Sequence, residues 1–219
     1  MDILTIKDKD YLGCDNCDKC CINRGDIKLT PINVIQISKH LSITIEEFLK
    51  KYTYELKDEE PEIAIRAVGE RKDCIFYDRE EKHCSIHKVE PMQCVMYPLV
   101  PENLKRDYFF NKGTCVCKEK KLIKIEKWLN GNHGIYKKYK DIYIEWIKLM
   151  EFIQENWKKI PLKTRKEIKR ILFKDYNLKK RNIKKQVRNN MNKVKKIYIE
   201  NVGATIGRPW PHRNTIDNE

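Results

Sequence analysis

The stretch Gly13-Cys14-Asp15-Asn16-Cys17-Asp18-Lys19-Cys20-Cys21 places four cysteines within eight consecutive positions. The two-residue gaps of this Cys-x2-Cys-x2-Cys-Cys run allow successive thiolates to curl around one centre in a tight loop. The residues between the cysteines are polar, so the run cannot supply a hydrophobic core in which free cysteines would be buried. We therefore expect the N-terminal part of the chain to fold around a metal centre, which is an iron-sulfur cluster or zinc.

Five more cysteines follow in the 219-residue chain, first Cys74, Cys84 and Cys94, spaced ten residues apart, and then Cys115 and Cys117. Tetrahedral zinc takes four ligands per ion, and a four-iron cluster takes up to four thiolates. The cysteines therefore suffice for two four-ligand centres, or for one centre and several structural thiols. The predicted metal ligands are Cys14, Cys17, Cys20, Cys21, Cys74, Cys84, Cys94 and Cys115.

The crowding of the thiolates bears on which metal is bound. Neighbouring side chains normally diverge, so we expect Cys20 and Cys21 to serve two ions, or two corners of a cluster, rather than one ion. Crowded soft ligands favour an iron-sulfur cluster, with [4Fe-4S] as the expected type, over zinc. The run differs from the two-cluster ferredoxin pattern C-x2-C-x2-C-x3-C-P, because its fourth cysteine follows the third directly. His83 and His87, which flank Cys84, are further candidate ligands.

The N-terminal residues Met1–Asp10 show neither the basic start nor the apolar block of an export signal. No stretch is apolar over the roughly 18 residues that a membrane span needs. We therefore predict a cytoplasmic protein without a membrane partner. In the reducing cytosol, metal–thiolate chemistry is favoured over disulfides. Disulfides remain the alternative, because proteins inside hyperthermophilic cells do contain them.

Hydrophobic periodicity predicts an α+β fold that is mostly helical, with a small cysteine-rich, metal-centred domain of few short strands followed by C-terminal helices. Thr30 before Pro31, and Thr44, are typical N-caps, and they predict two helices that pack together. The turn-like residues 78–81 predict a hairpin between 74–77 and 84–87. The expected helices are 31–40, 45–52, a short one near 92–97, 122–129, 135–157 and one or two within 162–200, and a strand is expected within 63–68.

The basic charge is concentrated near the C-terminus. The formal net charge is +14, and seventeen Lys or Arg face only two acidic residues between Lys158 and Lys196, so this segment carries +15 and the rest about −1. Such a segment could bind a protein or nucleic acid, although a solvated lysine-rich surface is the simpler interpretation. We expect a cysteine-cluster domain over 1–157, a basic helical extension over 158–202 and a disordered tail over 203–219.

Several blocks in the same order resemble the YkgJ-like CxxCxxCC cysteine-cluster family, whose members are described as zinc- or iron-chelating and which is related to the flagellin lysine N-methylase FliB. The resemblance covers roughly residues 14–117 and is specific, because it rests on several independent blocks. These blocks are the cysteine run, Leu29-Thr30-Pro31, the segment Ile45–Tyr52, Cys74-Ile75-Phe76-Tyr77, Cys84-Ser85-Ile86-His87, Pro91-Met92-Gln93-Cys94 and Tyr97-Pro98.

The chain departs from the family pattern R-P-x-x-C-R-x-F-P, because it has Glu90-Pro-Met-Gln-Cys-Val-Met-Tyr-Pro98 and lacks both arginines. The resemblance implies that the metal ligands and the fold are kept, whereas any contact of those arginines with an anionic substrate is lost. The methylase relatives imply an alternative, in which a [4Fe-4S] cluster and S-adenosylmethionine act in methyl transfer to protein lysine. A metal-stapled nucleic-acid-binding protein is a third interpretation. No sequence pattern of a hydrolase stands out.

Overall fold

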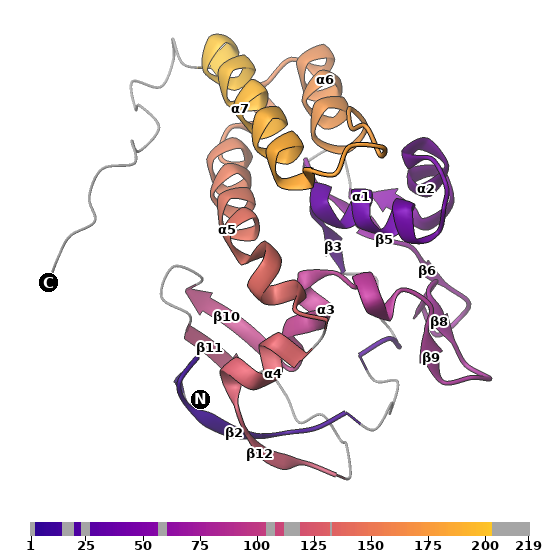
Figure 1. Cartoon of the computed structure of the whole chain (residues 1–219). Helices are drawn as coiled ribbons and strands as arrows, with labels where there is room; N and C mark the ends of the chain where they lie inside the picture. Colours follow the sequence, from indigo (N-terminus) through magenta and orange to yellow (C-terminus); the bar gives the residue numbers. More distant parts are fainter. Residues whose placement is uncertain are drawn as a thin grey trace, which may run out of the picture.

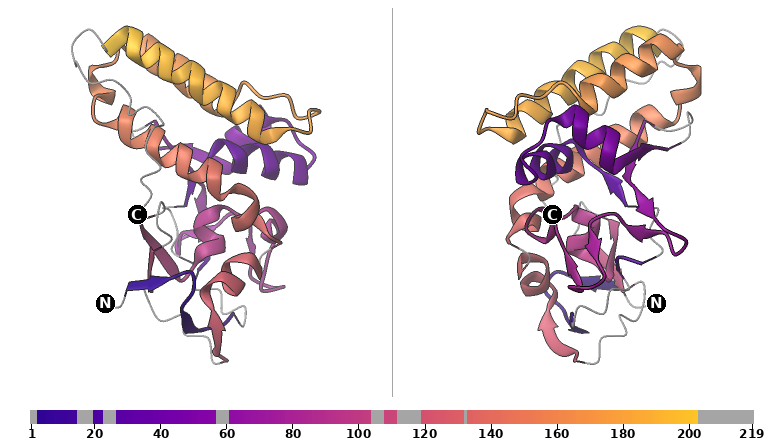
Figure 2. Two further views of the ribbon diagram at one scale, coloured as in Figure 1. Left: turned by 60° about the vertical axis from the view of Figure 1, so that its left-hand side comes forward. Right: turned by 90° about the vertical axis from the view of Figure 1, so that its right-hand side faces the viewer.

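The computed structural model of the chain (Figures 1 and 2) describes residues 3–14, 20–22, 27–56, 61–103, 108–111, 119–131 and 133–202. It has the predicted mostly helical α+β architecture, with about half of the described residues in helices. In Figure 1 the long C-terminal helices form the upper part, and the hairpins and short sheets lie below them. The cysteine-bearing elements are in this lower part.

Helices α1 (Pro31–His40) and α2 (Ile45–Tyr52) form as the sequence predicts, because each has a threonine cap. The backbone amide of Asn33 donates to Thr30 Oγ1 at 3.4 Å, and Asn33 Oδ1 accepts from the Thr30 amide at 2.9 Å, which completes a capping box. Thr44 Oγ1 accepts from the Glu47 amide at 3.1 Å. The two helices contact each other, as expected, and α1 is the more buried of the two.

A three-stranded antiparallel sheet lies beside these helices. It has the order β3-β5-β4, with β3 at Lys28–Leu29, β4 at Thr53–Glu55 and β5 at Ile63–Ile65. The strand predicted over 63–68 is divided at Arg66, whose guanidinium donates to the Lys50 and Thr53 carbonyls at 3.3 and 3.0 Å. The divided strand therefore belongs to two separate sheets.

The second part of that strand, β6 (Ala67–Val68), pairs with β7 (Asp73–Cys74). The next hairpin pairs β8 (Tyr77–Asp78) with β9 (His83–Cys84). Its turn forms as predicted, because Asp78 Oδ1 accepts the amides of Glu80 and Glu81 at 2.9 and 3.0 Å. The predicted pairing of 74–77 with 84–87 holds at Tyr77, which lies opposite Cys84, and at Phe76, whose carbonyl accepts from the Ser85 amide, whereas Cys74 pairs with Ala67 instead.

Two short helices follow the hairpin. A 3₁₀ turn, η1 (His87–Val89), precedes α3 (Met92–Met96), which is as short as the surrounding prolines predict. Helix α3 buries Met92, Val95 and Met96 and contacts helix α5 (Ile135–Gln154). Cys94 thereby lies on an element that is fixed to the core.

The N-terminal strands were not predicted, because their partners are about a hundred residues away. Strand β1 (Ile3–Thr5) pairs with β11 (Tyr108–Asn111), which also pairs with β10 (Leu99–Asn103). Strand β2 (Lys9–Leu12) pairs with β12 (Lys121–Lys124). The helix predicted over 122–129 was wrong at its start: Leu122 lies in β12 opposite Tyr11, and the helix, α4 (Ile125–Gly131), begins only at Ile125.

The C-terminal helices pack on one another and on the N-terminal half. Helix α6 (Leu162–Phe173) packs against α7 (Ile183–Val202), and both contact α1, while α7 also contacts α5. The rings of Trp146 and Phe173 meet edge to face at 5.6 Å between centroids. Helix α5 is followed by a 3₁₀ turn, η2 (Trp157–Lys159), in which Trp157 is fully buried.

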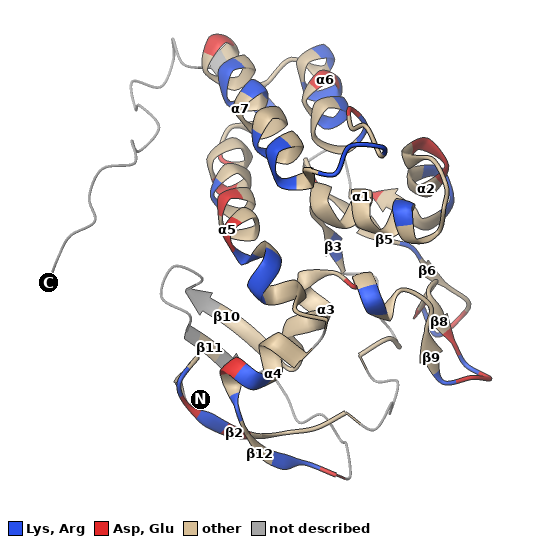
Figure 3. Ribbon diagram, in the orientation of Figure 1, with Lys and Arg blue, Asp and Glu red and all other residues tan. Residues whose placement is uncertain are grey.

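Part of the basic charge of α7 is neutralised by acidic residues of α5. Arg188 donates to Glu145 at 2.9 to 3.2 Å and to Asp141 at 2.7 Å, and Lys184 donates to Asp141 at 2.8 Å. Lys and Arg residues, blue in the ribbon of Figure 3, nevertheless continue along α6, α7 and the segment between them. Within the described ranges, no helix is long and apolar enough to cross a membrane.

Candidate metal centre

Five of the predicted cysteine ligands belong to four neighbouring segments of the described structure. Cys20 and Cys21 lie in a turn, Cys74 in β7, Cys84 in β9 and Cys94 in α3. The Cys74 amide donates to the Cys21 carbonyl at 2.8 Å, which joins the cysteine run directly to the β6–β7 hairpin. The Ser85 amide donates to the Phe76 carbonyl at 2.9 Å and fixes the strand that carries Cys84. Segments far apart in sequence are thus held together by backbone hydrogen bonds.

Cys20 and Cys21 converge, contrary to the expectation that adjacent side chains diverge. Their sulfur atoms lie 3.7 Å apart. Two thiolates on one tetrahedral zinc ion are about 3.8 Å apart when each Zn–S bond is about 2.3 Å. The pair is therefore spaced as two ligands of a single ion would be.

The five thiols lie within electrostatic range of one another. Burial raises the pKa of Cys84 to about 12, and the thiols of Cys74 and Cys20 add to that increase. Burial likewise raises the pKa of Cys94, with further contributions from Glu90 and from the other thiols. The pKa of Cys21 is raised first by its hydrogen bond with Cys20, then by burial and by Cys20, Cys84 and Cys74. These shifts favour the protonated form of Cys21, Cys84 and Cys94, so binding of a metal to them would displace protons.

Glu90 belongs to this cluster and was missed as a site residue. It is only 7% exposed, and its buried Oε1 has no hydrogen-bond partner among the residues that the structure describes. Burial raises the pKa of Glu90 from its ordinary 4.5 to about 7. His87 Nδ1 lies 3.5 Å from Glu90 Oε1. One signal in the sequence could have indicated Glu90 as a site residue: it stands between the apolar residues Val89 and Pro91, in a segment bounded by two cysteines.

The two candidate histidine ligands lie at the surface. His83 and His87 are both exposed, and the ring of His87 meets that of His133 edge on at 5.8 Å between centroids. The histidine rings therefore lie outside the buried part of the cysteine cluster. His87 reaches it through Glu90.

The remaining predicted cysteines are placed as follows. Cys14 is exposed just after β2. Cys17, Cys115 and Cys117 lie outside the described residues. Among the part of the chain that the structure describes, no three Cys, His, Asp or Glu side chains are grouped so that they could hold one metal ion. The donor set of five thiols nevertheless suits a soft metal such as iron or zinc.

A comparison with protein families bears directly on these thiols. The family model CxxCxxCC, described as "Putative zinc- or iron-chelating domain", matches residues 13–125. The chain belongs to the CxxCxxCC family. The matched CxxCxxCC region contains all nine cysteines and ends at the first residue of α4, so α5, α6 and α7 lie beyond it. No solved structure matches the chain.

Proposed function

We propose that the protein binds an iron-sulfur cluster through one thiolate from each of four segments. These are Cys74, Cys84, Cys94 and one of the pair Cys20 and Cys21. The observation that carries the proposal is that thiols from four separate segments lie close enough to interact electrostatically, with the Cys74 amide bonded to the Cys21 carbonyl. A four-iron cluster is held by four thiolates, one on each iron, so ligands from four directions match it.

The spacing of the thiols supports a cluster over a single ion. They interact electrostatically, and yet no three potential ligands among the described residues are close enough to hold one ion. A cluster spans more space than one ion, because each thiolate binds a different iron atom. Thiols from four segments therefore suit a cluster, which takes one thiolate on each iron atom.

Zinc is the second candidate, and the geometry of Cys20 and Cys21 favours it. Their 3.7 Å separation fits two ligands of one tetrahedral ion. A zinc site would use both of these cysteines, whereas a cluster would use only one of them. The two proposals therefore differ in how many members of the pair are needed.

The two candidates are tested by purifying the full chain without oxygen and measuring iron, sulfide and zinc per chain for single Cys→Ala variants. For a cluster, Cys74→Ala, Cys84→Ala and Cys94→Ala each lose iron and sulfide, and only one of Cys20→Ala and Cys21→Ala does so. For zinc, both members of the pair are needed and sulfide is absent.

Val95→Ala is the matched control for Cys94→Ala. Val95 is fully buried beside Cys94, so shortening it destabilises the same helix without removing a thiol. We expect Val95→Ala to keep its metal. If Val95→Ala and Cys94→Ala lost metal equally, Cys94 would be acting through the fold and not as a ligand. If all the Cys→Ala variants kept their metal, both candidates would be wrong.

A further inference from the structure

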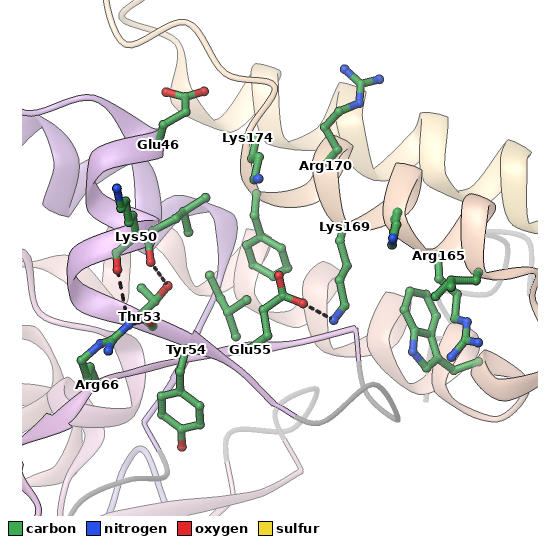
Figure 4. A pocket seen from close by; sticks show the side chains of 16 residues that line it. Glu46, Lys50, Thr53, Tyr54, Glu55, Arg66, Arg165, Lys169, Arg170 and Lys174 are labelled. Carbon is green, nitrogen blue, oxygen red and sulfur yellow. Dashed lines mark hydrogen bonds and ion pairs between the residues drawn. The ribbon is translucent and has the colours of Figure 1, made fainter.

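A groove is bounded by α2, strands β4 and β5 and helix α6 (Figure 4). Its volume is about 750 Å³, within the roughly 300–1,000 Å³ typical of sites for small molecules. The described residues that line it include no cysteine. We call it the cationic groove.

The charge of the cationic groove is strongly asymmetric. Among the residues that the structure describes, seven basic ones line the groove, against two acidic ones. The basic residues are Lys50, Arg66, Arg165, Lys166, Lys169, Arg170 and Lys174, and the acidic ones are Glu46 and Glu55. This surplus of five positive charges, gathered around one concave surface, attracts anions.

The basic residues reach the groove from both sides. Positions 165, 166, 169 and 170 follow the three- and four-residue spacing of one face of α6. Lys50 and Arg66 come from the other side, and Figure 4 shows Lys174 between them and Lys169, whereas Arg170 extends away. Arg170 is engaged by Asp175 at 2.9 Å. The groove thus presents ammonium groups from facing elements, a geometry suited to holding several anionic oxygens.

Like Arg170, Arg66 and Lys169 interact with other groups of the protein, and these two interactions differ in strength. Arg66 is committed to backbone carbonyls of Lys50 and Thr53. Lys169 is largely buried, with its side chain 16% exposed, and it donates to Glu55, whose side chain is 68% exposed, at 2.8 Å. An ion pair with a solvated carboxylate is weak, so an anionic ligand can compete with Glu55 for Lys169.

The base of the groove is apolar. Trp157, Phe173 and Ile63 are at most 4% exposed, and they close the space beneath the charged rim. Leu162, half exposed on α6, extends the apolar surface towards the opening. A ligand that is only a bare anion would leave this surface unused. The combination fits a molecule with both anionic and apolar parts.

We propose that the cationic groove binds a small phosphorylated ligand with an apolar part, of about the size of a nucleoside triphosphate. Lysine ammonium groups are well suited to phosphate, which they bind as point charges. The ligand's phosphates lie among Lys50, Lys169 and Lys174. Its apolar part lies towards Leu162 and the base of the groove.

The proposal is tested by titrating ATP, tripolyphosphate and S-adenosylmethionine into the purified full chain and measuring binding by calorimetry. We expect ATP to bind more tightly than tripolyphosphate, because only ATP has an apolar part, and more weakly as salt is added. S-adenosylmethionine lacks phosphate and is expected not to bind in the groove. The absence of ATP binding at millimolar concentration overturns the proposal, and equal affinity for ATP and tripolyphosphate overturns its apolar part.

Charge variants locate the site. The double variant Lys50→Glu with Lys174→Glu is expected to weaken ATP binding more than about tenfold, since it replaces two attractions by repulsions. The control, Lys179→Glu with Lys180→Glu, changes the net charge equally at exposed positions outside the groove and should change affinity less than about twofold. Equal losses in both double variants would show that only net charge matters and would overturn the proposal.

A gain-of-affinity variant guards against misfolding as the cause of any loss. Glu55→Gln removes the competitor of the ligand for Lys169 and should tighten ATP binding about two- to fivefold. Unchanged or weaker binding in Glu55→Gln would contradict the proposed position of the phosphates. RNA binding separates this proposal from a nucleic-acid surface. If the wild type binds RNA tightly, and if the Lys50→Glu, Lys174→Glu double variant keeps the wild-type affinity for both RNA and ATP, the groove is not the ligand site.

Discussion

Replacing Glu90 by glutamine should remove a pH dependence from the stability of the metal-free protein. Glu90 is 7% exposed, and its Oε1 has no hydrogen-bond partner in the described part of the chain. Burial raises its pKa from 4.5 to about 7, so the carboxyl binds a proton more tightly in the folded than in the unfolded chain. The resulting stabilisation is complete below about pH 4.5 and is lost as the pH rises through about 7.

The size of this effect follows from the two pKa values. The interval from 4.5 to about 7, at about 1.4 kcal/mol for each tenfold change in proton affinity, corresponds to about 3 kcal/mol. Glutamine is neutral at every pH and does not incur the cost of a buried charge. When the pH rises from 4.5 to 8, the free energy of unfolding of Glu90→Gln should therefore increase by about 3 kcal/mol relative to that of the wild type.

The assay is urea unfolding of reduced, chelator-treated protein at pH 4.5 and pH 8, followed by circular dichroism. Glu81→Gln is the control, because Glu81 lies in the exposed hairpin turn. Its difference from the wild type should stay within about 0.5 kcal/mol at both pH values. If the difference between Glu90→Gln and the wild type did not change with pH, the buried carboxyl would not titrate as we infer.

Three further changes test the packing around the site. Phe48 is fully buried, and its ring stacks on that of Tyr52 with 5.9 Å between ring centroids. Phe48→Ala should lower the free energy of unfolding by about 3–5 kcal/mol, and a loss below about 1 kcal/mol in urea unfolding would contradict its place in the core. Asn190→Ala should cost about 1–3 kcal/mol by the same assay, because its amide donates to two backbone carbonyls at 2.9 Å, and an unchanged midpoint would show that water replaces them. Thr44→Ala should lower the free energy of unfolding by about 1 kcal/mol, because the hydrogen bond from the Glu47 amide to the Thr44 hydroxyl is lost. Thr44→Ser keeps a hydroxyl and should retain most of that stability; equal losses in the two variants would argue against the cap.

The sequence predicted the elements that depend on local signals. The capping residues Thr30 and Thr44 and the apolar spacing behind them define α1 and α2 at the observed residues. The turn at Asp78 is likewise a local feature, since its carboxylate bonds amides two and three residues ahead. These interactions join neighbours in the chain, so a single sequence contains the information.

Elements that depend on distant partners could not be predicted in the same way. Ile3 lies opposite Phe110, and Tyr11 lies opposite Leu122, so neither strand has a local partner. Leu122 also fits a helical spacing, and only its pairing with β2 places it in a strand. Short strands with few residues give little periodicity, and their pairing is decided by tertiary contacts.

The site was predictable in its chemistry but not in its geometry. Cysteine spacing identified the ligands as candidates, and the fold brings Cys74, Cys84 and Cys94 near the Cys20 and Cys21 pair. The convergence of that pair was not foreseen, because it depends on the turn that carries it. Glu90 was missed because its burial arises from packing around the helix that follows it.

The most direct test of the account is the metal content and visible spectrum of the full chain purified without oxygen. A bound iron-sulfur cluster predicts brown protein with equal amounts of iron and sulfide, both lost in Cys84→Ala and retained in Val95→Ala. Colourless protein with stoichiometric zinc would make zinc the metal of this centre. Protein with neither iron nor zinc, and no uptake of either after reduction, would contradict the claim that these thiols form a metal centre.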